Sequence, residues 1–343
     1  MRKLPWHHLR NVETASTLML LAALVGLCAY FTSRSPHFFT VGNFQVIAGN
    51  YSVIAVATVG MALLMISGPV DLSIGSVVGA AGTLMALSVH DWGWPAGAAI
   101  AFAIGIGAVV GACNGLLVAV LGFNPVIVTL GTQLLVRGVL ELIRDTPVFD
   151  IGSTFRTIGS GELLGLPVQA WFAIGMFVLG GLFLTVTPWG RYVYAIGINR
   201  QAAFLSALPV RALPFFLYVA TGAGAGLAGM MLAARLNGAS PGDQGLTFEL
   251  QALTAILLGG VAWAGGRGRL SGVFLALVFL GVLENGLTLL NVSPFVQMVV
   301  RGCALIVAAG LDAMSGRLAG RLRFRARANV QRVAPAPELV TAG

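Results

Sequence analysis

The sequence is dominated by long apolar stretches separated by short polar segments, and these stretches constrain the fold more than any other feature. A membrane-spanning helix needs about 20 mostly apolar residues, because backbone polar groups in lipid must be satisfied within the segment. The stretches that approach this length lie near 15–33, 44–67, 72–90, 96–121, 125–143, 166–187, 213–235, 249–264, 270–290 and 294–312. We therefore predict an all-α, polytopic membrane protein with about ten transmembrane helices.

The composition agrees with a chain whose main solvent is lipid. Hydrophobic residues make up 57% of the 343 residues and charged residues 9%, whereas soluble domains carry about 25% charged residues. The 46 glycines suit a helical bundle in a membrane, because small residues let neighbouring backbones approach closely. These proportions exclude a soluble globular domain.

The distribution of basic residues predicts the orientation of the chain. With the N-terminus in the cytosol, about 14 Lys and Arg residues fall on the cytosolic side and about four on the other side, as the positive-inside rule requires. Both termini are then cytosolic. The transmembrane domain covers 1–316, and an Arg-rich cytosolic tail covers 317–343, with an end that we expect to be disordered. This topology explains the net charge of +8, so we expect membrane lipid as a partner and no nucleic acid.

Two similar segments indicate an internal duplication. Residues 66–80 (ISGPVDLSIGSVVGA) and 257–276 (LLGGVAWAGGRGRLSGVFLA) each place a Gly-rich break between apolar stretches. With ten helices, the second to fifth and the seventh to tenth would cross the membrane in opposite directions. Inverted repeats of this kind occur in many transporters, so we expect one here.

Several kinds of chemistry are missing from the sequence. The four histidines lie outside the predicted membrane core, at positions 7, 8, 37 and 90, which leaves no partner there for a nucleophilic Ser or Cys. The only lysine is Lys3, so the chain has no P-loop lysine to contact nucleotide phosphates. Three isolated cysteines form no disulfide framework or metal site. We predict no enzymatic activity and no cofactor; if ATP drives this protein, a separate subunit must bind it.

Polar residues within the predicted spans are candidates for function, because ionisable groups there are costly. Asp71 lies in an irregular segment, and two interpretations are open: it caps the next helix, or it lines a transport path. Glu284 and Arg301 could pair across the bundle, and Arg137 and Glu141 could pair along one helix. The candidates for a translocation path are Asp71, Ser73, Asn114, Asn124, Thr129 and Glu284.

The segment 191–214 is the longest polar break in the second half of the chain, and the orientation above places it in the cytosol. Asn199 is a suitable N-cap for a short helix over 200–208, which Pro209 would end. A small-plus-aromatic face of this helix would suit a groove on a protein partner. The residues predicted to share that face are Ala203, Phe204 and Ala207. The alternative is an amphipathic turn that lies on lipid headgroups.

Four blocks of sequence resemble the permease subunits of carbohydrate ABC importers of the ribose, xylose, arabinose and galactose type. They are SGPVDLSIGSVVGAAG (67–82), GACNGLLVAVLGFNPVIVTLGTQLLVRG (111–138), YAIGINRQAAFLSALPV (194–210) and LNGASPGDQGLTFELQALTAILLGGVAWAGGRGRLSG (236–272). Together they cover most of residues 40–312 in the family's order. Pro69 replaces the second Gly of the family's first block, and Ile198 and Ala207 stand where it usually has Gly.

The resemblance implies that residues 1–316 form the permease domain of an ATP-driven sugar importer in a bacterial inner membrane. It implies as partners a cytosolic ABC ATPase subunit, a periplasmic sugar-binding protein, and a second permease, identical or paralogous. It also implies that 191–214 is the coupling loop that docks on the ATPase. The positions expected to matter there are Asn199, Ala202, Ala203, Ser206 and Val210, with Phe204 as an exposed knob.

Other functions stay open on the residues alone. One is an ion-coupled secondary carrier that uses Asp71 or Glu284, and another is a membrane scaffold without a transport path. The segments 144–167 and 237–249, both predicted to be external, could dock a soluble partner or simply cover the bundle.

Overall fold

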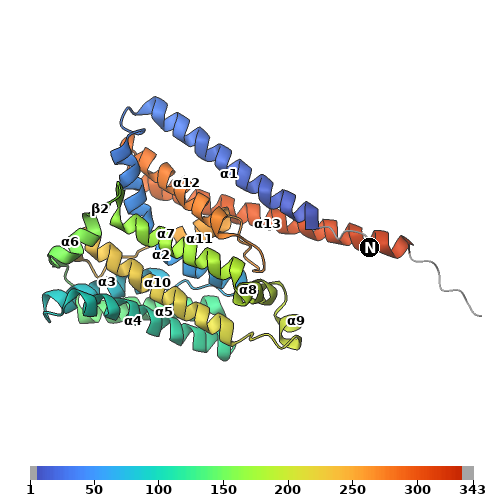
Figure 1. Ribbon diagram of the computed structural model, residues 1–343, viewed down its shortest axis with the longest axis horizontal. Coiled ribbons are helices and arrows are strands. Elements are labelled where there is room, and N and C mark those ends of the chain that lie inside the picture. Colours follow the sequence, from blue (N-terminus) through green and yellow to red (C-terminus); the bar gives the residue numbers. More distant parts are fainter. Residues whose placement is uncertain (1–5, 334–343) are drawn as a thin grey trace, which may run out of the picture.

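The chain forms a bundle of long helices, shown as a computed structural model in Figure 1, with its backbone described for residues 6–333 and its side chains for 17–314. The longer helices are α1 (Trp6–Arg34), α2 (Val41–Ser67), α3 (Ile74–His90), α4 (Ala96–Gly115), α5 (Pro125–Ile143), α7 (Val168–Val186), α10 (Ala212–Leu236), α12 (Leu270–Leu289) and α13 (Pro294–Val333). The shorter ones are the π-helix η1 (Leu116–Val120), α6 (Ser153–Ser160), α8 (Pro188–Ile198), α9 (Arg200–Leu205) and α11 (Phe248–Leu258). Two-residue strands occur at β1 (Val148–Phe149), β2 (Glu162–Leu163), β3 (Leu166–Pro167) and β4 (Gly238–Ala239).

The helices confirm a polytopic, all-helical membrane protein. Within residues 6–333, eight helices are long and apolar enough to cross a membrane: α1, α2, α4 with η1, α5, α7, α10, α12 and the first part of α13. The third and eighth predicted spans correspond to the shorter apolar helices α3 and α11, of 17 and 11 residues. The helix α3 starts late because residues 68–73 are irregular, and α11 ends at a Gly-rich turn in which Gly260 has a φ of 85°.

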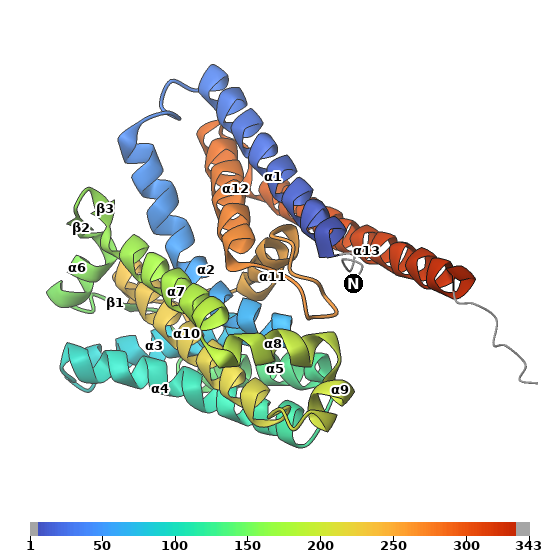
Figure 2. The same ribbon diagram turned by 45° about the vertical axis from the view of Figure 1, so that its right-hand side comes forward.

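Two helices, α2 and α10, form the centre of the bundle. Every residue of α2 from Ser52 to Ser67 is buried. The helix α10 contacts α2, α3 and α4, while α2 also contacts α7, α8, α11 and α12. Figure 2 shows α1, α12 and α13 on one side of the molecule and α3, α4 and α5 on the other, with α2 running between them. A helix that is apolar on all sides fits such a central place.

Small residues allow α4 and α10 to pack closely. A Cβ atom on Gly107 of α4 would overlap the backbone oxygen of Gly222 on α10, and one on Gly226 would overlap the backbone oxygen of Ala103. Close approach of this kind is typical of helix pairs in membranes, where van der Waals packing replaces the hydrophobic effect between helices.

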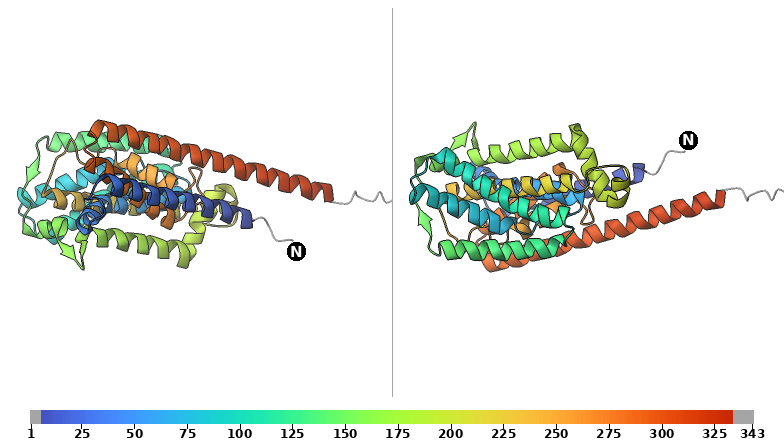
Figure 3. Two further views of the ribbon diagram at one scale, coloured as in Figure 1. Left: turned by 90° about the horizontal axis from the view of Figure 1, so that it is seen from above. Right: turned by 90° about the horizontal axis from the view of Figure 1, so that it is seen from below.

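The two ends of the bundle carry different structures. Figure 1 shows α8 and α9 at the same end as the start of α1 and the far end of α13, whereas α6 and β2 lie at the opposite end. At that opposite end, β1 pairs with β4, so the two segments predicted to be external, 144–167 and 237–249, lie together. The helix α13 extends past the rest of the bundle (Figure 3) and continues to Val333, through much of the predicted tail. The predicted disorder at the end of the chain falls on 334–343, outside the described residues.

Replacing Gly107 with Ala should destabilise the protein by about 1–3 kcal/mol, the usual cost of overpacking. The matched control is Gly105→Ala in the same helix, because a Cβ at Gly105 would meet no atom within 4 Å. The measurement is the midpoint of thermal unfolding of the detergent-purified protein. Equal midpoints for the two variants would contradict the close α4–α10 contact.

Candidate functional site

The break between α2 and α3 is buried and hydrogen-bonded within the protein. Gly68 turns the chain out of α2 with a φ of 117°. The Asp71 carboxylate then accepts hydrogen bonds from the backbone N–H of Ser73 (2.9 Å) and from its hydroxyl (2.6 Å). The hydroxyl of Tyr218 on α10 donates to the backbone oxygen of Val70 (3.0 Å). Irregular backbone at membrane depth is tolerated only with partners of this kind.

Asn114 ties this break to two other helices. Its Nδ2 donates to Ser73 Oγ (2.9 Å) and lies 3.4 Å from Asp71 Oδ1, while its Oδ1 accepts from Thr132 Oγ1 (2.7 Å). We call Asp71, Ser73, Asn114 and Thr132 the internal polar network; it joins the α2–α3 break to α4 and α5. The π-helix η1 starts two residues after Asn114, and π-helical turns are frequent at functional sites.

The structure brings together three of the predicted path residues, Asp71, Ser73 and Asn114, and adds Thr132. Each of the three is at most 1% exposed, so in this conformation they face protein rather than an open path. Asp71 bonds to Ser73, the residue just before α3, and α3 has no side-chain N-cap hydrogen bond, so Asp71 closes the turn before the helix rather than capping it. Thr132 belongs to the TLGT part of the second sequence block, but nothing in the sequence indicated which helix it would contact.

Two other predicted path residues lie outside this network. Asn124 accepts hydrogen bonds from the backbone N–H groups of Val126 (2.9 Å) and Ile127 (3.3 Å), so it caps α5, as the Asn-Pro pair predicts. Thr129 is buried, and its hydroxyl donates to the backbone oxygen of Pro125 in the same helix (2.8 Å). Both residues support α5 locally.

Glu284 belongs to a second polar cluster, between α2, α12 and α13. Its Oε2 accepts a hydrogen bond from the Tyr51 hydroxyl (2.6 Å), and its Oε1 lies 3.3 Å from Arg301 Nη2. This confirms the predicted pairing of Glu284 with Arg301. Tyr51 was not among the predicted site residues, although a tyrosine hydroxyl inside an apolar span needs a hydrogen-bond partner and is in itself a signal.

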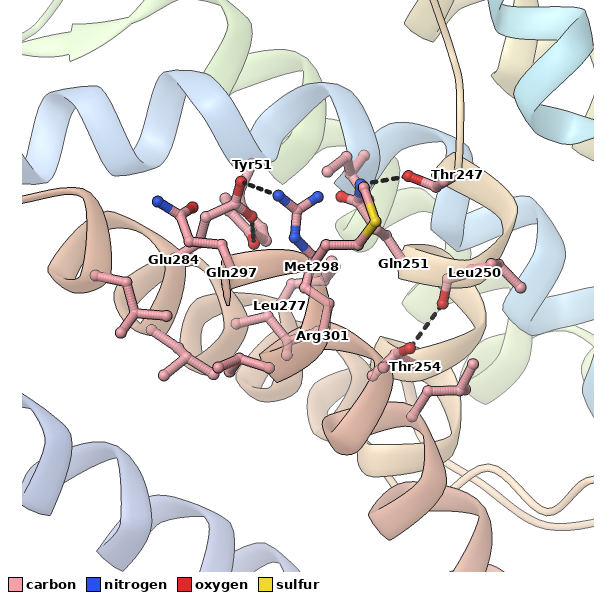
Figure 4. Close-up of a pocket in the computed structure, with 17 residues that line it drawn as sticks. Tyr51, Thr247, Leu250, Gln251, Thr254, Leu277, Glu284, Gln297, Met298 and Arg301 are labelled. Atoms are coloured by element: carbon pink, nitrogen blue, oxygen red, sulfur yellow. Dashed lines mark hydrogen bonds and ion pairs between the residues drawn. The ribbon is translucent and has the colours of Figure 1, made fainter. Parts of the chain in front are cut away.

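This second cluster borders a cavity of about 240 Å³ (Figure 4). Most of its wall is apolar and comes from α2, α11, α12 and α13. Outside the cluster, polar groups come from Gln297 on α13, from Thr254 on α11 and from the start of α11, where Gln251 Nε2 donates to Thr247 Oγ1 (3.3 Å). The cavity is therefore an apolar chamber with a few polar groups on its wall.

Arg137 differs from its prediction. Among the described residues, no ion pair joins it to Glu141; its Nη1 donates instead to the backbone oxygens of Pro241 (2.8 Å) and Gln244 (2.9 Å). Backbone oxygens that are enclosed by the bundle need donors, and a guanidinium can serve two of them at once. Arg137 thus fastens the segment after β4 onto α5.

The segment 191–214, predicted to be a coupling loop, is held on the bundle by hydrogen bonds. Asn199 Oδ1 accepts from the backbone N–H of Ala202 (3.0 Å), which confirms the predicted N-cap of α9. Arg200 Nη2 donates to the backbone oxygen of Ala119 (3.2 Å). The predicted helix over 200–208 is too long, because α9 ends at Leu205. Ala207 has a φ of 57°, a left-handed conformation that commonly follows a helix end.

The predicted shared face of Ala203, Phe204 and Ala207 is wrong. Ala203 is 4% exposed and packs on the bundle, whereas Phe204 is 60% and Leu205 78% exposed. Adjacent residues of a helix point about 100° apart, so 203 and 204 cannot share a face. Of the positions named in advance, Asn199, Ala202, Phe204 and Ser206 are exposed and Ala203 and Val210 are buried. Phe204 and Leu205 are therefore the large apolar side chains that α9 exposes.

Known proteins resemble this chain over most of its length. Residues 43–309 match the family described as "Branched-chain amino acid transport system / permease component". The Escherichia coli (strain K12) ribose import permease protein RbsC is 37% identical over 297 residues, 85% of this chain and 92% of that protein. The L-arabinose transport system permease protein AraH of the same strain is 34% identical over 304 residues, 86% and 89% of the two chains. The D-allose transport system permease protein AlsC of that strain is 31% identical over 312 residues, 90% and 94%.

The chain belongs to this family of transport permeases, and its similarity to sugar permeases confirms the resemblance of its four sequence blocks. It is a membrane transport protein rather than an enzyme. No solved structure gives a significant match.

Replacing Ala207 with Gly should stabilise the turn after α9 by about 1 kcal/mol, because Gly adopts the left-handed conformation without the steric cost that Ala pays. Ala202→Gly is the control: it should destabilise by about 1 kcal/mol, because Ala202 lies within the helix. The measurement is the rate of amide hydrogen exchange in α9 and its turn. Faster exchange in Ala207→Gly would contradict the observed backbone conformation.

Proposed function

We propose that this chain is the permease of an ATP-driven bacterial importer for a monosaccharide or related polyol. The observation that carries the proposal is its 31–37% identity to ribose, arabinose and allose permeases along nearly the whole chain. The sugar specificity of such a system rests largely with its binding protein, which receives the solute first. The permease itself supplies the path through the membrane.

The motor must be a separate ATPase subunit, because the only lysine, Lys3, leaves the chain without a P-loop. The docking site proposed for that subunit is α9. The helix α9 is held on the bundle by the buried Ala203 and by the Arg200–Ala119 hydrogen bond. A force on Phe204 and Leu205 would therefore move α9 as a rigid unit. Exposed aromatic side chains are common anchors of protein interfaces.

The proposed orientation places α9 and both chain ends in the cytosol. The helix α9, the start of α1 and the far end of α13 share one end of the bundle (Figure 1), and the positive-inside rule favours the cytosol for it. The opposite end, where β1 pairs with β4, would then face the periplasm and receive the sugar-binding protein. If the shorter helices α3 and α11 also contribute membrane spans, the chain has ten. We propose that it lies in the bacterial inner membrane beside a second permease, identical or paralogous.

An inverted repeat of α2–α5 and α10–α13 is supported by matching positions. Both α5 and α13 begin with a proline, and seven residues further on lie Thr132 and Arg301. Thr132 bonds to Asn114 on α4, while Arg301 pairs with Glu284 on α12. These two contacts therefore join corresponding pairs of helices, α4 with α5 and α12 with α13. In such transporters, one repeat rocks against the other to alternate access, and the internal polar network would act as a joint for this movement.

The ion-coupled alternative has less support. A proton-coupled carboxylate must exchange its proton with a path, yet Asp71 is enclosed by hydrogen bonds. Glu284 is paired with Arg301. We therefore expect neither residue to couple uptake to an ion gradient.

Replacing Phe204 with Ala should lower sugar uptake and sugar-stimulated ATP hydrolysis more than tenfold, the loss expected when an aromatic anchor worth about 2 kcal/mol is truncated. The assay uses proteoliposomes that hold the permease, its ATPase and its binding protein. Phe216→Ala is the matched control, because Phe216 is 64% exposed but lies on α10. Unimpaired coupling in Phe204→Ala would show that α9 is not the docking site.

A further inference from the structure

We infer that the cavity between α2, α11, α12 and α13 is a binding site for a monosaccharide in transit, held by Tyr51, Glu284 and Arg301. This inference rests on the proposed function and deepens it, because it assigns a sugar-contacting site to the permease itself.

The size and lining of the cavity suit a small organic ligand. Its volume is about 240 Å³, larger than the roughly 150 Å³ of an apolar cavity that holds benzene. Small-molecule sites commonly have mostly apolar walls and a few polar groups that fix the ligand. The leucines of α12 can contact the C–H faces of a sugar ring, while the ion pair and Gln297 can contact its hydroxyls.

The ion pair has unused hydrogen-bonding capacity. Arg301 has five N–H donors, and the described ion pair with Glu284 uses only its Nη2. The Glu284 carboxylate has about four acceptor positions, and the described contacts use two of them, for Tyr51 and Arg301. A ligand hydroxyl can accept a hydrogen bond from Arg301 and donate one to Glu284 at the same time.

The charge of the site favours a neutral polyol. Glu284 and Arg301 cancel each other, so an acid or an amine would leave a net charge within the membrane, which is costly. Hydroxyl groups can bridge the two partners without separating them. The side chains of Glu284 and Arg301 are 31% and 36% exposed, so a ligand in the cavity can reach them.

The position of the site fits a place along a path. Arg301 lies seven residues into α13, about 10 Å from its start along the helix axis. Tyr51 lies ten residues into α2. Leu250 and Met298, which also line the cavity, are 44% and 65% exposed. Ionisable residues at such depth face cavities or partners and commonly mark substrate pathways.

Saturation-transfer NMR on the full-length permease in lipid nanodiscs tests this site with D-ribose, L-arabinose and D-allose as probes. We expect at least one sugar to give a signal. Glu284→Gln should weaken its binding about tenfold, the effect of losing a hydrogen bond to a charged group. Leu280→Phe should do the same by filling the cavity. Tyr51→Phe removes only the hydroxyl and keeps the ring, so it serves as a third variant that should fold even if the other two do not. It should weaken sugar binding less than Glu284→Gln.

The matched control is Glu141→Gln, because Glu141 is an exposed acid in α5 and does not line the cavity. Its sugar signal should equal that of the wild type. The inference is overturned if no sugar gives a signal, or if all variants bind like the wild type. It is also overturned if L-leucine or a co-purified lipid, rather than a sugar, occupies the site in a Glu284-dependent way.

Uptake by the wild-type complex separates failure of the inference from failure of the proposed function. Transport of one of these sugars, combined with unchanged binding in Glu284→Gln and Leu280→Phe, would refute only the site. If the reconstituted complex transports none of the three sugars, the proposed substrate class fails, and the site assignment fails with it.

Discussion

The buried break between α2 and α3 is the constraint on which much of the structure depends. It connects α2, the central helix of the bundle, to α3 through buried irregular backbone, where an unpaired backbone group costs about 1–3 kcal/mol. Asp71, Asn114 and Tyr218 supply the partners, from the break itself, from α4 and from α10. Because these hydrogen bonds need fixed distances, they also fix how the three elements meet.

The end of α2 also contacts the segments around α8, which lead into the proposed coupling loop. The backbone N–H of Gly266, in the turn after α11, donates to the backbone oxygen of Ile66 at the end of α2 (2.8 Å). Gly197, near the end of α8, is so close to that oxygen that a Cβ would overlap it. A movement of α8 and α9 therefore meets the end of α2 directly, two residues before Gly68. This contact gives the proposed ATPase a short mechanical route to the centre of the bundle.

Features that depend on neighbours in the sequence were predictable. Apolar length predicted the spans, and the Asn-Pro and Asn-Arg pairs predicted the caps made by Asn124 and Asn199. The Glu284–Arg301 pair was predictable because an acid and a base in adjacent spans have few other partners. The end of α9 was missed, because it depends on an alanine that adopts a conformation more usual for glycine.

Features that depend on tertiary contacts were not predictable. The contact of Thr132 with Asn114 depends on how α4 lies beside α5. The Tyr51 hydroxyl signals the need for a partner without indicating Glu284 on α12. Arg137 was expected to pair within its own helix, but backbone oxygens of a distant segment compete for it. The shortness of α11 likewise follows from the turn that must bring 259–269 beside α2 and α8. A single sequence gives no direct indication of which distant segments will be in contact.

The most direct test of the account is the energy source of uptake. Proteoliposomes that hold the permease and its ATPase would enclose ATP, with the binding protein and labelled D-ribose, L-arabinose or D-allose outside. The account predicts uptake that continues when a protonophore collapses the proton gradient and stops when ATP is omitted. Uptake that follows an imposed proton gradient without ATP, and stops with the protonophore, would contradict it.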